Sequence, residues 1–351
     1  MPGAASPRRL TGANNLKVMS MTRPVTVGII GCGAIGVEHA RALAQVDGAR
    51  IAACCDLDPA RADAFCREYG ARYATTDSAR LIGDPALDAV YVLTHHDTHA
   101  GLCIQAAKAG KHIFVEKPLA LTVEDCLRVG RAVKQHGVTL MTGFKMRYYD
   151  LAQRMRNQMP RPLMLTMQMM DNRWPDDFWA NDPLKGGGNV LSQGCHSCDL
   201  LRFLARSDPL EVYAVGANYY QPSGVIDNLC ATFKFANGVA ASWVQGDCRV
   251  PPAVSKFFLQ GFDRDRSITL SDRLTRMVVH TADQGVQEIR GAESGFLEEN
   301  RAFIHALQNG LPAPIDARDG LYATLMVLQA FASIRSGKPE PIASVMSELS
   351  D

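Results

Sequence analysis

Short apolar runs alternate with longer amphipathic segments over about the first 144 residues. β-branched runs bounded by turn residues are typical of buried strands, and apolar positions at helical spacing are typical of helices. The pattern predicts strands over 24–30, 50–56, 86–94, 111–118 and 138–144. It predicts helices between them, over 37–46, 59–70, 99–110 and 122–137. Alternation of this kind indicates an α/β fold with a doubly wound parallel sheet.

The pattern changes after about residue 145, where alternating apolar runs follow one another. They predict strands over 163–170, 211–220, 228–246, 255–262, 267–272 and 276–281. Asn237-Gly238 lies between two such runs and is a good hairpin signal. We therefore expect a first domain over 23–144 and a second, α+β domain over 145–351 with a large, mostly antiparallel open sheet. Amphipathic helices over 294–310 and 318–337 end the chain and can pack back on the first domain.

The composition is that of a globular protein large enough for two domains, with 47% hydrophobic and 21% charged residues. The net charge is +1, so bulk charge favours neither a nucleic-acid nor a membrane-surface partner. No apolar stretch approaches the roughly 20 residues that a membrane span needs. Residues 1–22 are expected to form a flexible tail without a secretory signal. The ten cysteines are therefore expected to be reduced thiols in a cytoplasmic protein.

Directly after the first predicted strand, three glycines stand in GxGxxG spacing and a helical pattern follows. Gly31 allows a tight turn, Gly33 lets the backbone approach a pyrophosphate, and Gly36 lets the helix pack on its strand. The positive end of the helix dipole then faces the phosphates. The glycines alone are weak evidence, but the strand–turn–helix context predicts a Rossmann dinucleotide site. Its expected residues are Gly31, Gly33, Ala34, Ile35 and Gly36.

The second predicted strand ends on Asp56, 25 residues after Gly31. A carboxylate there accepts hydrogen bonds from the ribose hydroxyls and repels a 2′-phosphate. No arginine immediately follows Asp56, so the sequence favours NAD over NADP as the cofactor.

Two further residues stand at expected strand ends, where ligands bind in doubly wound sheets. Thr94 ends one strand, and Lys117 ends the next between Glu116 and Pro118. Most lysines are simply exposed, and position alone does not decide between that ordinary role and a place in the cofactor cleft.

Several segments together resemble the glucose–fructose oxidoreductase, inositol dehydrogenase and MocA family. They are GIIGCGAIG (28–36), VYVLT (90–94), AGKHIFVEKPLA (109–120), GFKMRY (143–148) and the glycine-led helix over 186–203. The segment over 109–120 is the most specific of them. The resemblance covers nearly the whole chain from about residue 22. It implies an NAD(P)-dependent oxidoreductase acting on sugars or cyclitols.

The resemblance also implies roles for individual residues. Lys117 matches the lysine that contacts substrate and nicotinamide, and His196 matches the histidine of a DxxxH pair. Asp199 matches an acid that touches substrate hydroxyls, and Arg147 matches one arginine of the GFxRRF motif. Ser192 stands where the family has the aspartate of that pair, which is the main departure.

Two other positions depart from the family pattern. Met146 replaces the first arginine of GFxRRF, and His95-His96 follow Thr94 where TPN is common. His99 matches a histidine that usually follows. The cofactor-binding residues expected from these matches are Thr94, His96, His99, Glu116 and Lys117.

Ser192, His196 and Asp199 are spaced i, i+4, i+7 and therefore share one helix face. We hypothesise that His196 takes the proton of a substrate hydroxyl while hydride leaves the same carbon for the nicotinamide. Lys117 would stabilise the developing alkoxide, and Asp199 and Arg147 would hold neighbouring hydroxyls. A serine hydroxyl can orient the imidazole but brings no charge, so carbonyl reduction with His196 as proton donor stays open.

The histidines and cysteines have two other possible roles, a structural one and the binding of a metal. A helix with one histidine is more often structural than catalytic. Neither possible metal set has the paired ligand spacing of a zinc site, so we expect no metal. These sets are Cys195, His196 and Cys198, and His95, His96, His99 and Cys103.

A long loop over 171–188 precedes the helix and carries two tryptophans. Trp179 or Trp174 can stack on a sugar ring or the nicotinamide, although a core role is as reasonable. We expect a sugar or polyol substrate and a homodimer or homotetramer formed through the second sheet. Two other functions stay open: an enzyme that keeps NAD bound for glycoside cleavage or epimerisation, and a non-enzymatic regulator that senses dinucleotide.

Overall fold

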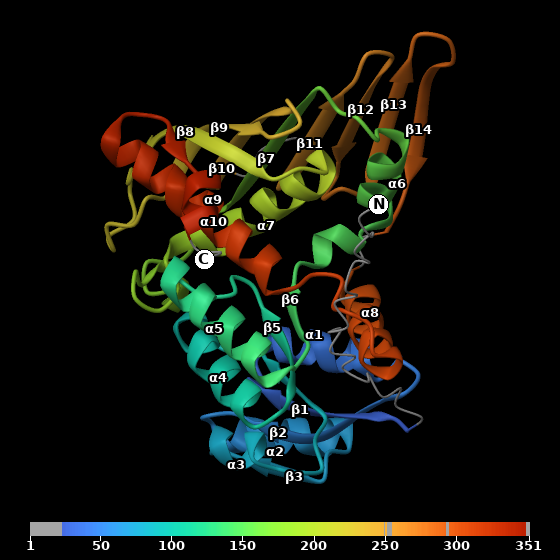
Figure 1. Cartoon of the computed structure of the whole chain (residues 1–351), viewed down its shortest axis with the longest axis vertical. Coiled ribbons are helices and arrows are strands. Elements are labelled where there is room, and N and C mark those ends of the chain that lie inside the picture. The colour runs from blue at the N-terminus through green and yellow to red at the C-terminus, as the bar shows by residue number, and fades with distance from the viewer. Residues whose placement is uncertain (1–22, 249, 251–254, 293–294, 349–351) are drawn as a thin grey trace, which may run out of the picture.

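The computed structural model describes residues 23–248, 250, 255–292 and 295–348. The expected flexible tail over 1–22 lies outside the described residues. The molecule has two sheets, one at each end, with helices between and around them (Figure 1). No helix among the described residues is both long and apolar enough to cross a membrane.

The first sheet is parallel, as the alternating pattern predicted, and has six strands among the described residues, one more than the five expected. In space they run β3-β2-β1-β4-β5-β6, the order of doubly wound dinucleotide-binding folds. The strands are β1 (Val25–Ile30), β2 (Ala49–Cys55), β3 (Tyr73–Thr75), β4 (Ala89–Val92), β5 (His112–Glu116) and β6 (Leu140–Gly143). The helices between them are α1 (Ala34–Leu43), α2 (Pro59–Tyr69), α3 (Ser78–Ile82), α4 (His96–Lys108) and α5 (Val123–His136).

Local sequence signals explain most of these bounds. Asp58 caps α2 by accepting hydrogen bonds from Ala60 and Arg61, and Thr122 caps α5. Gly70 and Gly137 end the same helices in the left-handed conformation. β3 and α3 were not predicted, because they have three and five residues and are too short to show a period.

The second sheet has nine strands in the order β14-β13-β12-β11-β7-β10-β9-β8-β15. Within the described part of the chain only β7 and β10 of this sheet pair in parallel, so the predicted mostly antiparallel sheet is confirmed. The strands are β7 (Met164–Asn172), β8 (Pro209–Ala217), β9 (Asn228–Phe235), β10 (Ala240–Cys248), β11 (Phe257–Phe262), β12 (Arg266–Ser271), β13 (Arg276–Thr281), β14 (Gly285–Arg290) and β15 (Glu340–Pro341). Of these, β14 and β15 were not predicted, because β14 is almost wholly exposed and β15 has two residues.

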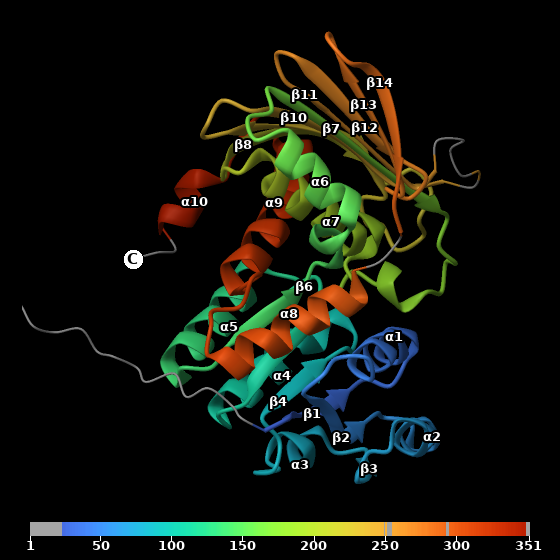
Figure 2. The same ribbon diagram turned by 90° about the vertical axis from the view of Figure 1, so that its right-hand side faces the viewer.

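Helices cover one face of the second sheet and connect it to the first. The other helical segments are η1 (Lys145–Tyr148), α6 (Asp150–Gln158), η2 (Trp179–Asn181), α7 (Gly188–Ala205), α8 (Phe296–Asn309), α9 (Ala317–Ser336) and α10 (Ala343–Glu348). Both α7 and α9 pack on the inner face of the second sheet. The orange-red α8 returns to the first sheet and lies beside α1 (Figure 2). Phe303 and Leu307 of α8 share a buried cluster with Val25 and Val27 of β1.

Candidate active site

The glycine turn after β1 has the geometry that a pyrophosphate requires. Gly31 has φ +100°, and a Cβ on it would lie 2.3 Å from the carbonyl oxygen of Leu93. A Cβ on Gly36 would lie 2.2 Å from the carbonyl oxygen of Gly31. A Cβ on Gly33 would meet no atom within 4 Å, and no side chain caps α1. The first-turn N–H groups, including those of Ala34 and Ile35, are thus open to an anionic ligand, which fits a dinucleotide.

Asp56 follows β2 beside this turn. Its carboxylate accepts hydrogen bonds from the backbone N–H of Cys32 at 2.8 Å and of Asp58 at 3.0 Å. The guanidinium of Arg61 lies 3.4 Å from Asp56 and 3.7 Å from Asp58. Only folding brings Arg61 to the carboxylate, since it stands five residues further along, in α2.

The end of β4 is joined to the end of β5 by His99. Its two ring nitrogens lie 2.8 Å from the carbonyl oxygen of Pro118 and 3.1 Å from that of Thr94. The neighbouring His96 donates from Nδ1 to the carbonyl oxygen of Gly186 at 3.0 Å. His96 thereby ties α4 to the loop before α7, and this fixes one wall of the cleft.

Two cavities lie between the sheets and meet at Lys117. They share the side chains of Ile35, Glu116, Lys117 and Gln193. The first, of about 220 Å³, is also lined by Leu93, Thr94, His96, Trp174, Phe178, Trp179, Ala180 and Ser192. The second, of about 150 Å³, is also lined by Lys145, Met146, Tyr149, His196, Lys256, Phe257, Arg273 and Phe296. Since Ile35 is on α1, both cavities border the dinucleotide turn.

Trp179 lies in the wall of the first cavity, where its ring stacks on His95 at 4.0 Å between centroids. Four residues that line the cavities were not predicted from the sequence: Gln193, Lys145, Lys256 and Arg273. Lys145 belongs to the GFKMRY segment, so the resemblance of that segment to the family could have pointed to it. No comparable motif marks Lys256 or Arg273.

Lys117 connects the first sheet to α7. Its ammonium donates a hydrogen bond to the carbonyl oxygen of Ser192 at 3.2 Å. His196, one turn further along α7, lines the second cavity together with Lys117. Burial, followed by the ammonium groups of Lys117, Lys145 and Lys256, lowers the pKa of His196 well below its ordinary value. The imidazole is therefore uncharged at neutral pH.

Ser192 does not orient that imidazole in the way a carboxylate would. Its hydrogen bonds to Lys117 and to the thiol of Cys195 go through the backbone carbonyl. Nδ1 of His196 is buried and has no hydrogen-bond partner among the described residues. No carboxylate therefore accepts a hydrogen bond from Nδ1 of His196 among the described residues.

Arg147 and Asp199 bind each other and do not line either cavity. Nε and Nη2 of Arg147 donate to the two carboxylate oxygens of Asp199 at 2.8 and 2.5 Å. Asp319 in α9 lies 3.1 Å from the same guanidinium. The pair is buried and joins η1 to α7 and α9, so it sets where Lys145 and His196 stand.

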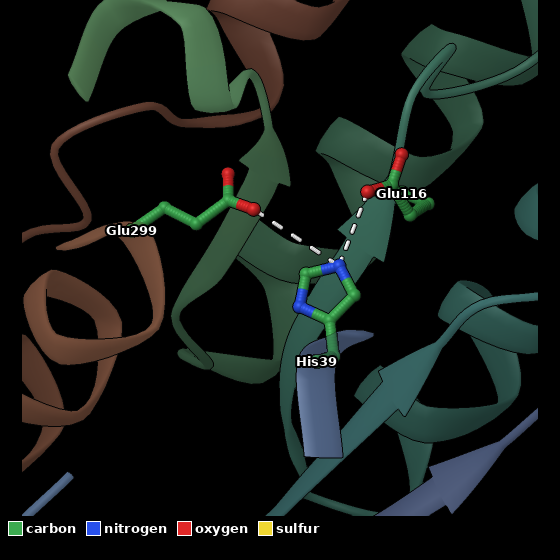
Figure 3. Close-up of side chains that lie close together, drawn as sticks. All are labelled: His39, Glu116 and Glu299. Atoms are coloured by element: carbon green, nitrogen blue, oxygen red, sulfur yellow. Dashed lines mark hydrogen bonds and ion pairs between the residues drawn. The ribbon is translucent and has the colours of Figure 1, made fainter. Parts of the chain in front are cut away.

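A second buried cluster lies behind Glu116 (Figure 3). Nε2 of His39, in α1, is 3.1 Å from Glu116 and 4.0 Å from Glu299, in α8. It is the only group of three metal-ligating side chains that comes together among the described residues, and it includes neither set weighed from the sequence. Neither oxygen of the fully buried Glu299 has a hydrogen-bond partner there.

The tautomer of His39 argues against a metal in this cluster. Nδ2 of Asn300 donates both to the carbonyl oxygen of Phe296 at 2.7 Å and to Nδ1 of His39 at 3.0 Å. The Phe296 carbonyl determines this orientation of the amide, so Nδ1 is the acceptor and Nε2 carries the proton. A protonated Nε2 donates to Glu116 and offers no lone pair to a metal.

The two carboxyl groups of the cluster hold one negative charge between them. Burial alone would raise the pKa of Glu116, but the hydrogen bond from His39 and the charge of Lys117 outweigh it and lower that pKa. Burial and then the charge of Glu116 raise the pKa of Glu299 well above its ordinary value. Glu116 is thus ionised and Glu299 protonated, as expected for two carboxyls close together in a dry site.

Comparison with known protein families agrees with this geometry. The model of the oxidoreductase family with an NAD-binding Rossmann fold, GFO/IDH/MocA, matches residues 25–144. The model of the GFO/IDH/MocA C-terminal domain matches residues 157–255. The chain belongs to the GFO/IDH/MocA family. It is an NAD-binding oxidoreductase of that family, as the resemblance of its motifs implied.

Individual relatives align with nearly the whole chain. An uncharacterized oxidoreductase, YrbE, of Bacillus subtilis is 28% identical and covers 92% of this chain and 98% of its own. Myo-inositol 2-dehydrogenase of Thermotoga maritima is 27% identical, and the alignment covers 91% of this chain and 99% of that protein. A solved structure of a probable dehydrogenase from Thermotoga maritima has a TM-score of 0.78 at 27% identity. The match covers 92% of this chain and 100% of that one. Levoglucosan dehydrogenase in complex with NADH and levoglucosan has the same fold, with a TM-score of 0.84 at 22% identity and coverage of 91% and 99%.

The protonation of Glu299 predicts how stability depends on pH. Because its pKa in the folded protein is above the ordinary value near 4.3, burial of Glu299 weakens the folded state progressively as the pH rises. Glu299→Gln has the same shape and no charge to lose. We therefore expect the melting temperature of Glu299→Gln minus that of the unaltered protein to be larger at pH 8 than at pH 5.

The control is Glu124→Gln on α5, whose side chain is 73% exposed. It should shift the melting temperature equally at both pH values. A Glu299→Gln difference that is likewise independent of pH would show that Glu299 is ionised in the folded protein.

Proposed function

We propose that the protein is an NAD-dependent dehydrogenase that oxidises a CH–OH group of a sugar, sugar derivative or cyclitol, with His196 as acid–base and Lys117 as its electrostatic partner. One observation carries the proposal. Lys117 after β5 and His196 in α7 line one cavity, which also borders Ile35 of the cofactor turn. Relatives named inositol 2-dehydrogenase and 1,5-anhydro-D-fructose reductase support a polyol or sugar substrate.

The residues of the cavity can carry out the proton chemistry of this reaction. Bound nicotinamide supplies the hydride acceptor. The neutral imidazole of His196 accepts the substrate hydroxyl proton on a ring nitrogen. The ammonium of Lys117 stabilises the alkoxide that develops as this proton leaves. In the opposite direction the imidazolium of His196 returns this proton to the oxygen of the carbonyl group that receives the hydride.

Arg147 and Asp199 act in this scheme as positioning residues. Their ion pair holds η1 against α7 and so keeps Lys145 and His196 on the same cavity. Glu116 sits behind Lys117 and accepts a hydrogen bond from its backbone N–H at 3.0 Å, which fixes the direction in which the lysine leaves β5.

Removing either catalytic group should abolish most of the turnover. We expect Lys117→Ala and His196→Ala each to lower kcat at least about 10²-fold with a panel of sugars and inositols, because each deletes a charge or proton step made in the transition state. NADH formation is followed by absorbance. Lys108→Ala, an exposed lysine near the end of α4, is the matched control and should keep full activity. Full activity in both site variants would rule out the mechanism.

NAD is the proposed cofactor because two carboxylates surround the guanidinium of Arg61 beside the predicted ribose site. Arg61 is paired with both Asp56 and Asp58, so a 2′-phosphate would meet two negative charges. We expect kcat/KM to favour NAD over NADP by at least about 10-fold, and Asp56→Ser to shift that ratio toward NADP.

Asp63→Asn, an exposed residue of α2, serves as the control for this cofactor preference and should leave the NAD to NADP ratio unchanged. A ratio that does not respond to Asp56→Ser would contradict the placement of the ribose beside this carboxylate.

The open face of the second sheet is the proposed subunit interface. Tyr213 and Val215 of β8 are 43% and 54% exposed, and Val215 lies opposite the exposed Cys230 of β9. Neighbouring apolar side chains on an uncovered sheet face favour association. Sedimentation should show a dimer or tetramer that Tyr213→Glu with Val215→Glu dissociates. Leu311→Glu, 47% exposed after α8, should not dissociate it. A monomer at micromolar concentration would exclude the interface.

A further inference from the structure

The cavity that contains His196 is strongly cationic. Four cationic side chains line it, Lys117, Lys145, Lys256 and Arg273. Glu116 is the only carboxylate among its described lining residues. A neutral polyol needs hydrogen-bond donors and acceptors in its site, but it does not need several cationic groups around one small cavity.

These cations come from different parts of the fold. Lys117 follows β5, Lys145 begins η1, Lys256 precedes β11, and Arg273 lies in the turn between β12 and β13. Like charges brought together in a partly dry site repel one another, and an anion that enters the cavity reduces this repulsion. Burial lowers the pKa of Lys256, although its ion pair with Asp171 at 2.6 Å opposes the shift.

Aromatic rings hold three of the cations at the cavity wall. Nζ of Lys145 lies 4.0 Å from the centre of the Phe296 ring. Nζ of Lys256 and Cζ of Arg273 lie 5.3 and 5.5 Å from the centre of the Phe257 ring. Both rings line the same cavity. Stacking on rings of the cavity wall limits where these charges can go and keeps them near the cavity.

The turn that carries Arg273 has an unusual backbone. Asp272, Arg273 and Leu274 have φ values of 50°, 58° and 65°, a region that residues other than glycine seldom occupy. The fully buried side chain of Leu274 anchors the turn, and the N–H of Arg273 donates to Oγ of Ser255 at 3.0 Å. Strained turns of this kind persist where the surrounding structure determines the position of a particular side chain.

We propose that the substrate carries an anionic group, a carboxylate or a phosphate, which Lys145, Lys256 and Arg273 bind while a hydroxyl of the same molecule faces His196. The inference rests on the proposed function and names its substrate class as acidic sugars, sugar phosphates or their cyclitol counterparts. Guanidinium and ammonium groups are the usual protein ligands of both anions.

An anionic substrate would also assist the base. Nδ1 of His196 has no partner among the described residues, and three ammonium groups oppose its protonation. A carboxylate or phosphate among those ammonium groups offsets their charge, so that His196 accepts a proton more readily with the substrate bound. The substrate then provides the negative charge that Ser192 does not supply.

The test compares neutral and anionic molecules with the same carbon skeleton. The protein saturated with NADH is titrated by calorimetry at constant ionic strength with D-glucose, D-glucuronate and D-glucose 6-phosphate. The same is done with D-galactose and D-galacturonate, and with myo-inositol and its monophosphate. We expect at least one anionic member to bind about 10-fold or more tightly than its neutral partner. The carboxylate and phosphate members distinguish the two anions. If no anionic member binds more tightly than its neutral partner, or if none of the compounds binds, the proposal is overturned.

Variants test whether these cations cause the tighter binding of anionic compounds. Arg273→Gln and Lys256→Met should each reduce it several-fold, whereas Lys256→Arg should retain it. Arg276→Gln is the control on the same hairpin, because Arg276 pairs with Glu288 outside the cavity. An anion preference that survives in both Arg273→Gln and Lys256→Met overturns the assignment of these residues.

Turnover of the same panel with NAD separates this inference from the proposed function. NADH formation from neutral members, without any anion preference in binding, overturns only the anionic substrate class. Tight binding of an anionic member with no NADH formation from any compound of the panel supports the anion site and counts against hydride transfer.

Discussion

The hydrogen bond from the Lys117 ammonium to the Ser192 carbonyl connects the two halves of the candidate site. Lys117 leaves the carboxyl end of a parallel strand, where a doubly wound sheet exposes its ligands. Ser192 belongs to the helix that presents His196. The contact brings a cation of the first sheet next to a helix that packs on the second sheet. It therefore holds the Lys117 ammonium directly against α7.

Buried charges behind Lys117 support this contact. Glu116 is ionised because His39 and Lys117 stabilise it, and Glu299 remains protonated because the same space cannot hold a second negative charge. The cluster joins α1, β5 and α8, so the helix that returns from the second half of the chain also helps to orient Lys117. Placing the wrong charge in such a site is costly because little water reaches it.

Charge is distributed unevenly around His196. On the α7 side Ser192 offers no carboxylate, and on the opposite side several cations line the cavity. Arg147 and Asp199 neutralise each other in a bidentate pair. His196 therefore lies in a positive field, so a charged ligand in the cavity changes how readily its imidazole is protonated.

The local pattern of the sequence determined much of this protein. Alternating apolar runs predicted both sheets, and the glycine spacing predicted the turn at α1, because strand burial and tight turns depend on neighbouring residues. The ends of β4 and β5 likewise pointed to Thr94 and Lys117. β3, α3 and β15 have too few residues to show a period, and β14 is almost wholly exposed and has no buried face to reveal it. Contacts between distant residues were decided only by tertiary structure. They include His39 with Glu299, Arg147 with Asp199, Arg61 with Asp56, and Lys256 with Arg273 at one cavity. No local signal encodes them, since each depends on how separate elements pack.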